Sequence, residues 1–345
     1  MSSIPPADWS IPALAGALRR LVADAGRVSL ELFKVMIPVL VVMRLLAALD
    51  LVGMLAAPLG PVMGLVGLPP ETGLIWAAAM LNNIYGGIAV YLSIMGDLPL
   101  TAAQATVLWT LLLAAHSLPV ELSIARRSGP RVAFQLISRI TGGLALGWLL
   151  HVIYSATGAL ADPATVLLPA APAADPGWVA WAVAQVKNLA MVFGVILGLL
   201  ALIRLLTVLR VTEAMNALLR PVLRVMGIGE RASTITIIGL TLGISYGGGL
   251  IIREVREGGL DRRDVFFSLT LMGQCHSLFE DTLLMAMVGG HLSGILWGRL
   301  FFALAAVALL VPVSRWLPTR LADRFLWGPP RAEAAPPLDS RTPAA

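Results

Sequence analysis

Charged residues are scarce in this chain, and cysteine is nearly absent. Only 13% of the 345 residues are charged while 58% are hydrophobic, and the mean hydropathy is +0.84. A soluble domain rarely reaches that apolar fraction, so the composition predicts an all-α, polytopic membrane protein. The single cysteine, Cys275, excludes internal disulfides and any metal site built from several cysteines.

Several sequence motifs are missing as well. The chain has neither a Walker A pattern nor an H-E-x-x-H pattern, so nucleotide hydrolysis and zincin chemistry find no support. The first 24 residues contain Asp8, Arg19, Arg20 and Asp24, and we therefore expect no cleavable signal peptide. The net charge of +5 is modest. In a membrane protein it reports on loop orientation, and we expect no nucleic-acid partner.

What stands out is a polar stretch, Gln274 to Asp281, inside the apolar segment 265–288. A helix of that length crosses the roughly 30 Å hydrocarbon core. A carboxylate at that depth costs about 2.5–3.5 kcal/mol, so it must face the protein interior, a partner or water. We therefore expect a substrate or ion site formed by the polar side chains of this stretch: Gln274, His276, Ser277, Glu280 and Asp281.

This polar stretch has a counterpart 160 positions earlier. His116 and Ser117 correspond to His276 and Ser277, again inside an apolar segment (102–125), and Glu121 corresponds to Asp281. Further pairs keep the same spacing: Arg44 and Arg204, Pro61 and Pro221, Gly67 and Gly227, and Arg139 and Arg299. The spacing predicts two copies of one unit.

Each copy also contains an apolar segment interrupted by glycines. Tyr85-Gly86-Gly87 matches Tyr246-Gly247-Gly248-Gly249 with a shift of one residue. Glycine permits tight reversals, and the freed backbone groups can be satisfied inside the protein or in a water-lined cavity. We therefore expect two re-entrant helical hairpins whose hinges are Gly86, Gly87, Gly247, Gly248 and Gly249.

The positions of the arginines favour re-entrant segments over full crossings. If every apolar segment crossed, Arg126, Arg127 and Arg131 would lie opposite the basic amino terminus, against the positive-inside rule. With re-entrant hairpins, nearly all loop arginines share one side. The prediction is two inverted repeats, each of three spanning helices plus one hairpin, in a bacterial-type inner membrane with both termini cytoplasmic.

Five regions follow from this organisation. They are an amphipathic segment (1–28), a first repeat (29–158), a periplasmic Pro/Ala-rich linker (159–186), a second repeat (187–315), and a partly disordered cytoplasmic tail (316–345). The first region either lies at the membrane interface or is a solvated lead-in helix.

Paired apolar units with a Tyr-Gly-Gly break and a polar motif on the next helix resemble the Gate domain, also called the nucleoside-recognition domain. The resemblance covers residues 30–160 and 187–315. That domain occurs in concentrative nucleoside transporters, in the membrane part of ferrous-iron transporters and in spore-maturation-type membrane proteins. The chain departs from the iron transporters because it lacks their GTPase domain and a cysteine in either Tyr-Gly-Gly segment.

Two interpretations of the polar residues remain open. His276 and Glu280, four residues apart, share one face of a continuous helix, and with His116, Ser117 and Glu121 they bind substrate, relay protons or hold a cation. The predicted metal ligands are then His116, His276, Glu280 and Asp281. In the other interpretation these side chains form only a buried polar clasp between helices.

The remaining polar residues near these motifs also allow two roles. Arg44 and Arg204 either bind an anionic substrate or neutralise the buried carboxylates, and we favour the charge pairs. Residues beside the glycine breaks either bind substrate by hydrogen bonds or serve turn chemistry; they are Asn82, Asn83, Tyr85, Ser245 and Tyr246.

The leading functional hypothesis is a secondary transporter or permease for a small polar or ionic solute, with its site near the membrane midplane. The coupling ion is a proton or another cation, and no further cofactor is expected. The alternatives are a divalent metal cation transporter and a non-transporting scaffold or regulator. An enzyme ranks third because no nucleophile motif supports it. The expected partners are the substrate and lipid, and a homo-oligomer is left open.

Overall fold

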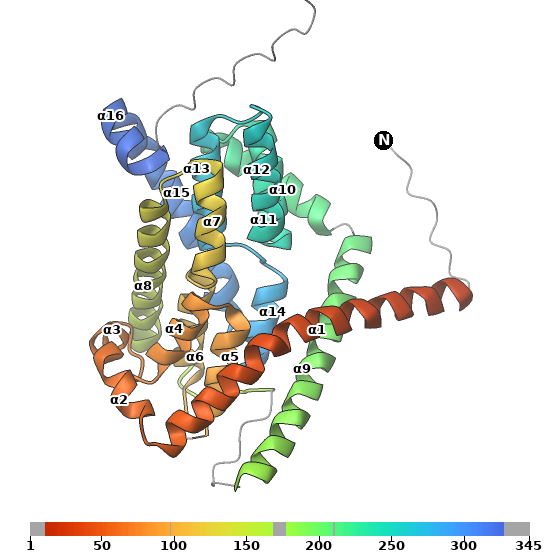
Figure 1. The fold of residues 1–345 in the computed structure, drawn as a ribbon. Helices are drawn as coiled ribbons and strands as arrows, with labels where there is room; N and C mark the ends of the chain where they lie inside the picture. Colours follow the sequence, from red (N-terminus) through yellow and green to blue (C-terminus); the bar gives the residue numbers. More distant parts are fainter. Residues whose placement is uncertain (1–10, 97, 168–176, 210, 328–345) are drawn as a thin grey trace, which may run out of the picture.

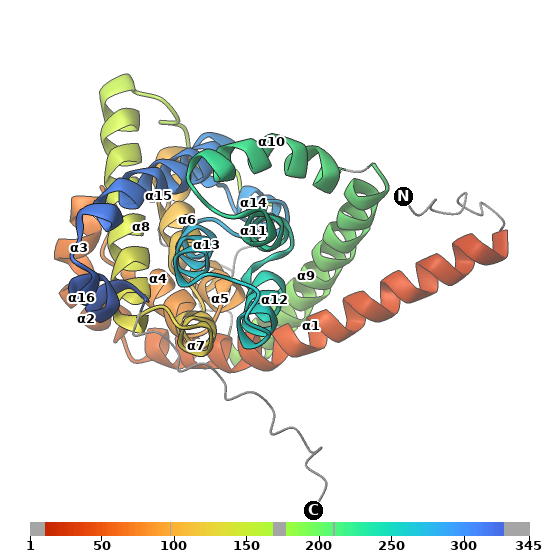
Figure 2. The same ribbon diagram turned by 90° about the horizontal axis from the view of Figure 1, so that it is seen from above.

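Helices account for almost all of the described structure (Figures 1 and 2). The computed structural model describes residues 11–96, 98–167, 177–209 and 211–327. Within these ranges the only strand-like pairing is an isolated bridge between Thr101 and Pro163. The all-α prediction is confirmed.

The first half of the chain forms α1 to α8. Their bounds are α1 Ile11–Ala48, α2 Val52–Ala56, the 3-10 turn η1 Ala57–Leu59, α3 Gly60–Leu65, α4 Thr72–Leu81, α5 Ile84–Ile94, α6 Ala102–Ala114, α7 Leu118–Ser128 and α8 Val132–Thr157.

The second half forms α9 to α16. Their bounds are α9 Gly177–Val208, α10 Val211–Val225, α11 Glu230–Leu242, α12 Ile244–Arg256, α13 Arg262–Gln274, α14 Glu280–Met287, η2 Ser293–Gly298, α15 Arg299–Trp316, α16 Thr319–Ala322 and η3 Asp323–Trp327.

The helix bounds repeat along the chain. Helices α6 and α13 begin and end 160 positions apart, and α5 and α12 also begin 160 positions apart. Gly67 and Gly227, which follow α3 and α10, both have positive φ. Helix boundaries and positive-φ glycines therefore recur at the same spacing of 160 residues as the sequence motifs.

Within the described residues, four helical segments are long and apolar enough to cross a membrane. They are Ala102–Ser128, Val132–Thr157, Gly177–Leu202 and Ser293–Trp316, and a fifth is Leu18–Ala48 with Val52–Leu65 if that pair, bent by 109°, counts as one span. Helices α13 and α14, which were predicted to cross as one unbroken helix, are separated by residues 275–279.

Two helix boundaries differ from those expected. Helix α1 is continuous from Ile11 to Ala48, because Gly26 alone does not interrupt the run of helix-forming residues across the expected boundary at 28. Helix α9 begins at Gly177, inside the predicted linker. The tail beyond residue 327 lies outside the described residues.

Helices α6 and α13 form the centre of the molecule. Every residue from Ala105 to Ala114 and from Val265 to Gln274 is buried, as expected for helices that are apolar on all sides. After a break in each of these helices, the chain continues as α7 beyond α6 and as α14 beyond α13 (Figure 1). We call α6–α7 and α13–α14 the two broken paths.

The two broken paths, α6–α7 and α13–α14, run in opposite directions. At one end the indole of Trp109 in α6 donates to the carbonyl of Val288, just after α14. At the other end, Arg131 after α7 and Arg262 at the start of α13 both contact the η3 segment at Asp323. The paths cross between these ends.

Each half also contains a helical hairpin. Helix α5 packs back on α4, since a Cβ at Gly87 would lie 3.0 Å from the Ala79 side chain. Helix α12 packs back on α11, since a Cβ at Gly247 would lie 2.6 Å from the Gly239 backbone. Helical hairpins are present in both segments where the sequence predicted them, and their re-entry into the membrane stays a prediction.

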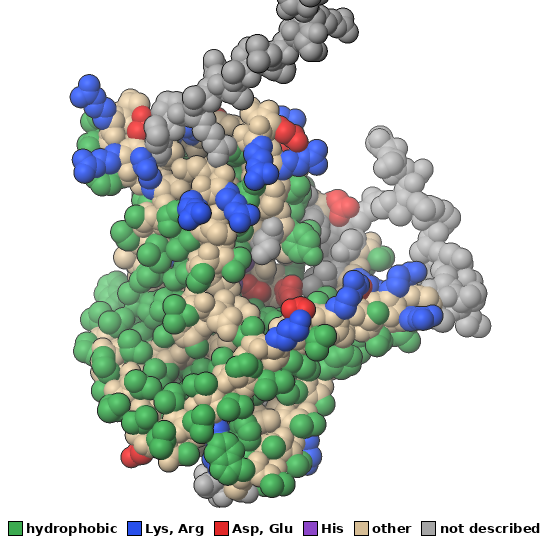
Figure 3. Space-filling model, in the orientation of Figure 1, with side chains coloured by type: hydrophobic (Ala, Val, Ile, Leu, Met, Phe, Trp, Pro, Cys, Tyr) green, Lys and Arg blue, Asp and Glu red, His purple; other side chains and the backbone are tan. Residues whose placement is uncertain are grey.

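Basic side chains gather at one end of the molecule (Figure 3). This end holds the last turns of α7 and α12 and the start of α13, and its arginines include Arg126, Arg127, Arg253, Arg256, Arg262 and Arg263. Hydrophobic side chains cover much of the remaining visible surface (Figure 3), which is the pattern of a protein embedded in lipid.

Candidate functional site

The breaks in the two central paths share an unusual backbone conformation. Ser117 and Ser277 both have φ of 48°, in the left-handed region that non-glycine residues rarely adopt. Pro119 lies in the first turn of α7, where the missing N–H of proline is tolerated. Each central helix is therefore completely broken here, and His276 and Glu280 do not share a helix as the prediction required.

The exposed backbone groups at each break are satisfied by the preceding hairpin. The N–H of Ser117 donates to the carbonyl of Ala79 in α4 at 2.9 Å. The N–H of Leu278 donates to the carbonyl of Leu240 in α11 at 2.8 Å. Each break is therefore anchored to the hairpin of its own half, as non-helical backbone at membrane depth requires.

His116 and His276 meet where the two paths cross. Their Nε2 atoms lie 3.2 Å apart, and only 5% and 3% of the two residues is exposed. Nδ1 of His116 is 3.1 Å from the carbonyl of Leu112, and Nδ1 of His276 is 2.7 Å from the carbonyl of Met272. In both halves the ring is thus oriented by a hydrogen bond to the carbonyl four residues before it in the chain.

Glu121 of α7 completes a compact cluster with this pair. Its Oε1 lies 3.5 Å from Nε2 of His116 and 3.6 Å from Nε2 of His276. Its Oε2 accepts a hydrogen bond of 2.5 Å from Nη1 of Arg139 in α8. Nε of Arg139 donates to the carbonyl of Ala114 at the end of α6. We call His116, His276 and Glu121 the triad.

The corresponding residues of the second half are arranged differently. Asp281 occupies the position equivalent to Glu121 and is 5% exposed. Arg299, equivalent to Arg139, donates to Thr282 Oγ1 at 3.2 Å. Its Nε and Nη1 find no hydrogen-bond partner among the described residues. The two halves therefore place the same groups at the crossing, but only the first forms the tight carboxylate–arginine pair.

The expected charge partners, Arg44 and Arg204, have contacts with residues other than the buried carboxylates. Arg44 lies over the ring of Trp178, 5.4 Å from its centroid, and Arg204 donates to Asp24 at 2.5 Å. Both come from the long helices α1 and α9, whereas α8, which carries Arg139, packs directly against α6 and α7. Arg139 neutralises Glu121 because it lies on that neighbouring helix.

A hollow of about 390 Å³ opens beside the triad. It lies between the central breaks, the hairpin turns and α1, and Figure 3 shows acidic side chains in a depression next to α1. Eleven of the thirteen binding residues expected from the sequence are among its lining: Asn82, Asn83, Tyr85, His116, Ser117, Glu121, Tyr246, His276, Ser277, Glu280 and Asp281.

The other two expected site residues are Gln274 and Ser245. Gln274 points to α8, where its Nε2 donates to the carbonyl of Ser138 at 2.6 Å. The side chain of Ser245 lies outside the described part of the structure. Asn83, although it lines the hollow, also caps α5 by accepting a hydrogen bond from the Gly86 N–H at 3.0 Å, which is the turn chemistry considered above.

The hinge glycines do not lie at the reversals. The chain turns at Asn82-Asn83 and at Gly243, whose φ is 101°, while Gly87 and Gly247 lie inside α5 and α12. Their role is close packing. A Cβ at Gly87 would lie 2.7 Å from Leu112, and one at Gly247 would lie 2.9 Å from Met272.

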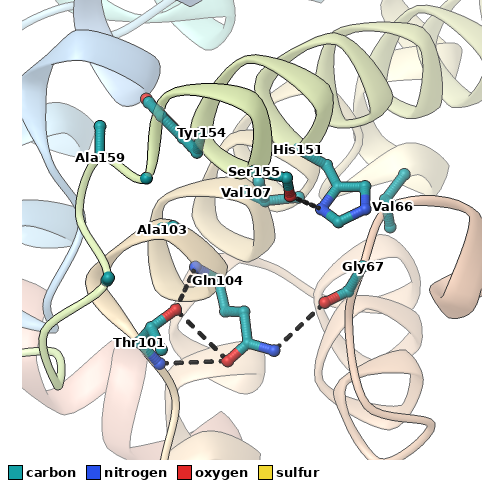
Figure 4. A pocket seen from close by; sticks show the side chains of 12 residues that line it. Val66, Gly67, Thr101, Ala103, Gln104, Val107, His151, Tyr154, Ser155 and Ala159 are labelled. Carbon is teal, nitrogen blue, oxygen red and sulfur yellow. Dashed lines mark hydrogen bonds between the residues drawn. The ribbon is translucent and has the colours of Figure 1, made fainter.

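A second pocket of about 300 Å³ lies near the start of α6 (Figure 4). Gln104 donates there to the carbonyl of Gly67 at 3.2 Å, and with Thr101 it forms the capping box of α6. The ring of His151 lies beside Ser155 (Figure 4). These polar groups bond to one another and to the backbone of Gly67, so they hold the loop after α3 against α6. Fewer of them are left to bind a ligand, and the hollow is therefore the better candidate site.

Comparison with known proteins supports the membrane assignment. The chain is similar to "Uncharacterized membrane protein YvoD" of Bacillus subtilis (strain 168), with 26% identity over 296 residues, covering 85% of this chain and 94% of that protein. No family model and no solved structure matches the chain. With its apolar helices, the chain is a membrane protein.

Proposed function

We propose that this protein is a permease that moves a small polar or ionic solute across the membrane through the hollow beside the triad. One observation carries the proposal. Two oppositely directed broken helices place their breaks together at a buried polar cluster, with His116 and His276 only 3.2 Å apart. Discontinuous helices that meet at a polar site are the substrate-binding device of many secondary transporters.

The proposal includes an inverted repeat. Its support is the matched geometry at a spacing of 160 residues: Ser117 and Ser277 share φ of 48°, and Arg139 and Arg299 are both almost fully buried. Opposite directions of α6–α7 and α13–α14 then relate the halves by an approximate two-fold axis. Because α5 and α12 begin 160 positions apart, Gly87 corresponds to Gly247 in these helices without the shift expected from the sequence.

The resemblance to Gate-domain proteins agrees with this proposal. Both involve paired units, each with a hairpin followed by a broken helix that bears a polar motif. We place the protein in a bacterial-type inner membrane with its basic end cytoplasmic, because loop arginines favour that side. Both termini are then cytoplasmic, as the positions of the arginines suggested.

Alternating access follows from the position of the hollow. Hairpin turns from both halves line it, through Asn82 of the first half and Gly243 of the second. If the halves rock about the central crossing, the hollow opens first to one side of the membrane and then to the other. A scaffold would keep the hollow open to one side only.

Labelling from both sides of the membrane tests the proposal without knowledge of the solute. In a Cys275→Ser background, Val120→Cys places a thiol at the edge of the hollow, where Val120 is 56% exposed. We expect an impermeant maleimide to label it in both right-side-out and inside-out vesicles. Glu257→Cys, at the basic end, is the control and is expected to react in inside-out vesicles alone.

Labelling of Val120→Cys in only one vesicle orientation, with the control reacting as expected, would contradict a permease and favour a scaffold. Cys275 is fully buried. Its replacement by serine exchanges one sulfur atom for oxygen and therefore changes the buried volume only slightly. The fraction of folded protein is measured in each preparation by size-exclusion chromatography.

A further inference from the structure

We propose that the triad is a binding site for a divalent transition-metal ion, held by Nε2 of His116, Nε2 of His276 and Oε1 of Glu121. The site itself stands on its own geometry. That the metal is also the transported solute rests on the function proposed above. Imidazole nitrogen with carboxylate oxygen is a donor set that suits Zn²⁺, Fe²⁺, Mn²⁺, Co²⁺ and Ni²⁺.

The hydrogen bonds of the two imidazoles determine which nitrogen of each ring bears the proton. A carbonyl oxygen can only accept, so Nδ1 of each ring must donate its proton to Leu112 or Met272. In a neutral ring the Nε2 atom is then a bare lone pair. Two such lone pairs face each other at 3.2 Å, an arrangement that is repulsive unless a cation lies between them.

The distances among the two Nε2 atoms and Oε1 of Glu121 fit a single metal ion between them. They are 3.2, 3.5 and 3.6 Å. A point equidistant from three atoms so spaced lies about 2.0 Å from each, which is the length of a bond from zinc to histidine nitrogen or carboxylate oxygen. One ion can therefore bind all three atoms without rearrangement of the backbone.

Arg139 supports the third ligand. It binds Oε2 of Glu121 at 2.5 Å and leaves Oε1 free toward the imidazoles. The backbone bonds of the two histidines do the same for the rings. Partners of this kind orient ligands in metal sites and are worth about 10–100-fold in affinity.

The net charge near the site stays small with or without a bound dication. Arg139 and Arg299 are buried close to three carboxylates, those of Glu121, Glu280 and Asp281. With all five groups ionised, the cluster carries one net negative charge. A bound dication changes it to one net positive charge, so neither state concentrates several like charges.

The ligand set differs from the one expected from the sequence. Glu280 and Asp281 line the hollow, but among the described residues the group with ligand atoms close enough for one ion is the triad alone. The two carboxylates lie on the approach and draw cations into the hollow. Three protein ligands leave a further coordination position for water, as in sites that exchange their ion or its ligands.

Metal binding by the purified, full-length protein in detergent tests the proposal. After treatment with EDTA, the protein is dialysed against Co²⁺ or Zn²⁺, and bound metal is counted by mass spectrometry. We expect one ion per chain. His116→Gln, His276→Gln and Glu121→Gln should each weaken binding at least about 100-fold, beyond the loss typical of an outer-shell partner.

The chain supplies matched controls. Its two other histidines, His151 and His291, lie outside the triad, so His151→Gln and His291→Gln should keep one ion per chain. Asp281→Asn removes a charge beside the triad but no ligand of the ion, so it should weaken binding much less than His116→Gln does. Loss of the ion in Asp281→Asn with retention in His116→Gln would overturn the ligand assignment.

Wild-type protein alone also decides the question if a variant fails to fold. Bound Co²⁺ should give visible absorption bands typical of nitrogen and oxygen ligands. Wild-type protein that binds no more Co²⁺ or Zn²⁺ than a protein-free detergent blank overturns the site and leaves a shared proton between the rings. Metal binding in detergent without two-sided labelling of Val120→Cys would support the metal site and contradict the permease. Two-sided labelling without metal binding would support the permease and contradict the metal site.

Discussion

The buried pair of Arg139 and Glu121 provides the sharpest prediction for stability. Their side chains are 2% and 4% exposed, so replacing Arg139 with Met leaves an uncompensated carboxylate inside the protein. Loss of one partner from such a pair destabilises a protein by about 3–5 kcal/mol. Arg139→Met also removes the donor to the carbonyl of Ala114, which acts in the same direction.

A surface pair gives the matched control. Arg231 and Glu254 lie 3.2 Å apart, with 66% of the Arg231 side chain exposed, and a pair of this kind contributes about 0–1 kcal/mol. Arg231→Met should therefore change stability far less than Arg139→Met. The double variant Glu121→Gln/Arg139→Met removes both buried charges and should recover much of the loss, because a neutral amide is less costly to bury than a carboxylate.

The assay is the free energy of unfolding in metal-free detergent, measured for wild type, the three variants and Glu121→Gln to complete a double-mutant cycle. The reasoning is refuted if Arg139→Met lies within about 1 kcal/mol of Arg231→Met. It is also refuted if the double variant is as unstable as the sum of the two single changes, since the pair would then have no coupling energy.

Two further predictions concern packing and topology. Gly247→Ala should destabilise the protein by about 1–3 kcal/mol, because its Cβ would lie 2.6 Å from the Gly239 backbone, whereas Gly249→Ala, with open space around it, should be neutral or slightly stabilising; equal melting temperatures for the two variants would contradict the hairpin packing. In the background without cysteine, Ala161→Cys should react with an impermeant maleimide in right-side-out vesicles and Glu257→Cys only in inside-out vesicles, and reaction of both from one side would rule out opposite locations.

Much of the site follows from the sequence because ionisable groups in apolar segments are few. His116, Glu121, His276 and Asp281 stand out against hydrophobic neighbours, and their equal spacing predicts that they meet. The structure brings them to one crossing. Membrane insertion excludes most other locations for such residues, so the pattern alone carries unusual information about tertiary contacts.

The break in each central helix could not be located in the same way. Serine in the left-handed region has no sequence signature, and Ser277 has no proline after it to mark the spot. The tie from Leu278 to the carbonyl of Leu240 is a tertiary contact that stabilises the break. For that reason the segment containing His276 was predicted as one continuous helix.

The charge partner was missed for a related reason. Arg139 lies near the start of a long apolar run and is 18 residues from Glu121, so no helical periodicity connects them. Only the packing of α8 against α7 brings the guanidinium to the carboxylate. Arg44 and Arg204 have the same spacing of 160 residues as Arg139 and Arg299, and spacing alone does not distinguish the two pairs.

The most direct test of the central claim is an experimental structure of the protein with bound Co²⁺, with the metal located by its anomalous scattering. The account predicts one peak at the crossing of the two broken helices, about 2.0–2.2 Å from Nε2 of His116, Nε2 of His276 and an oxygen of Glu121. A peak between Glu280 and Asp281, or imidazoles that lie apart on separate faces of the helical bundle, would contradict it.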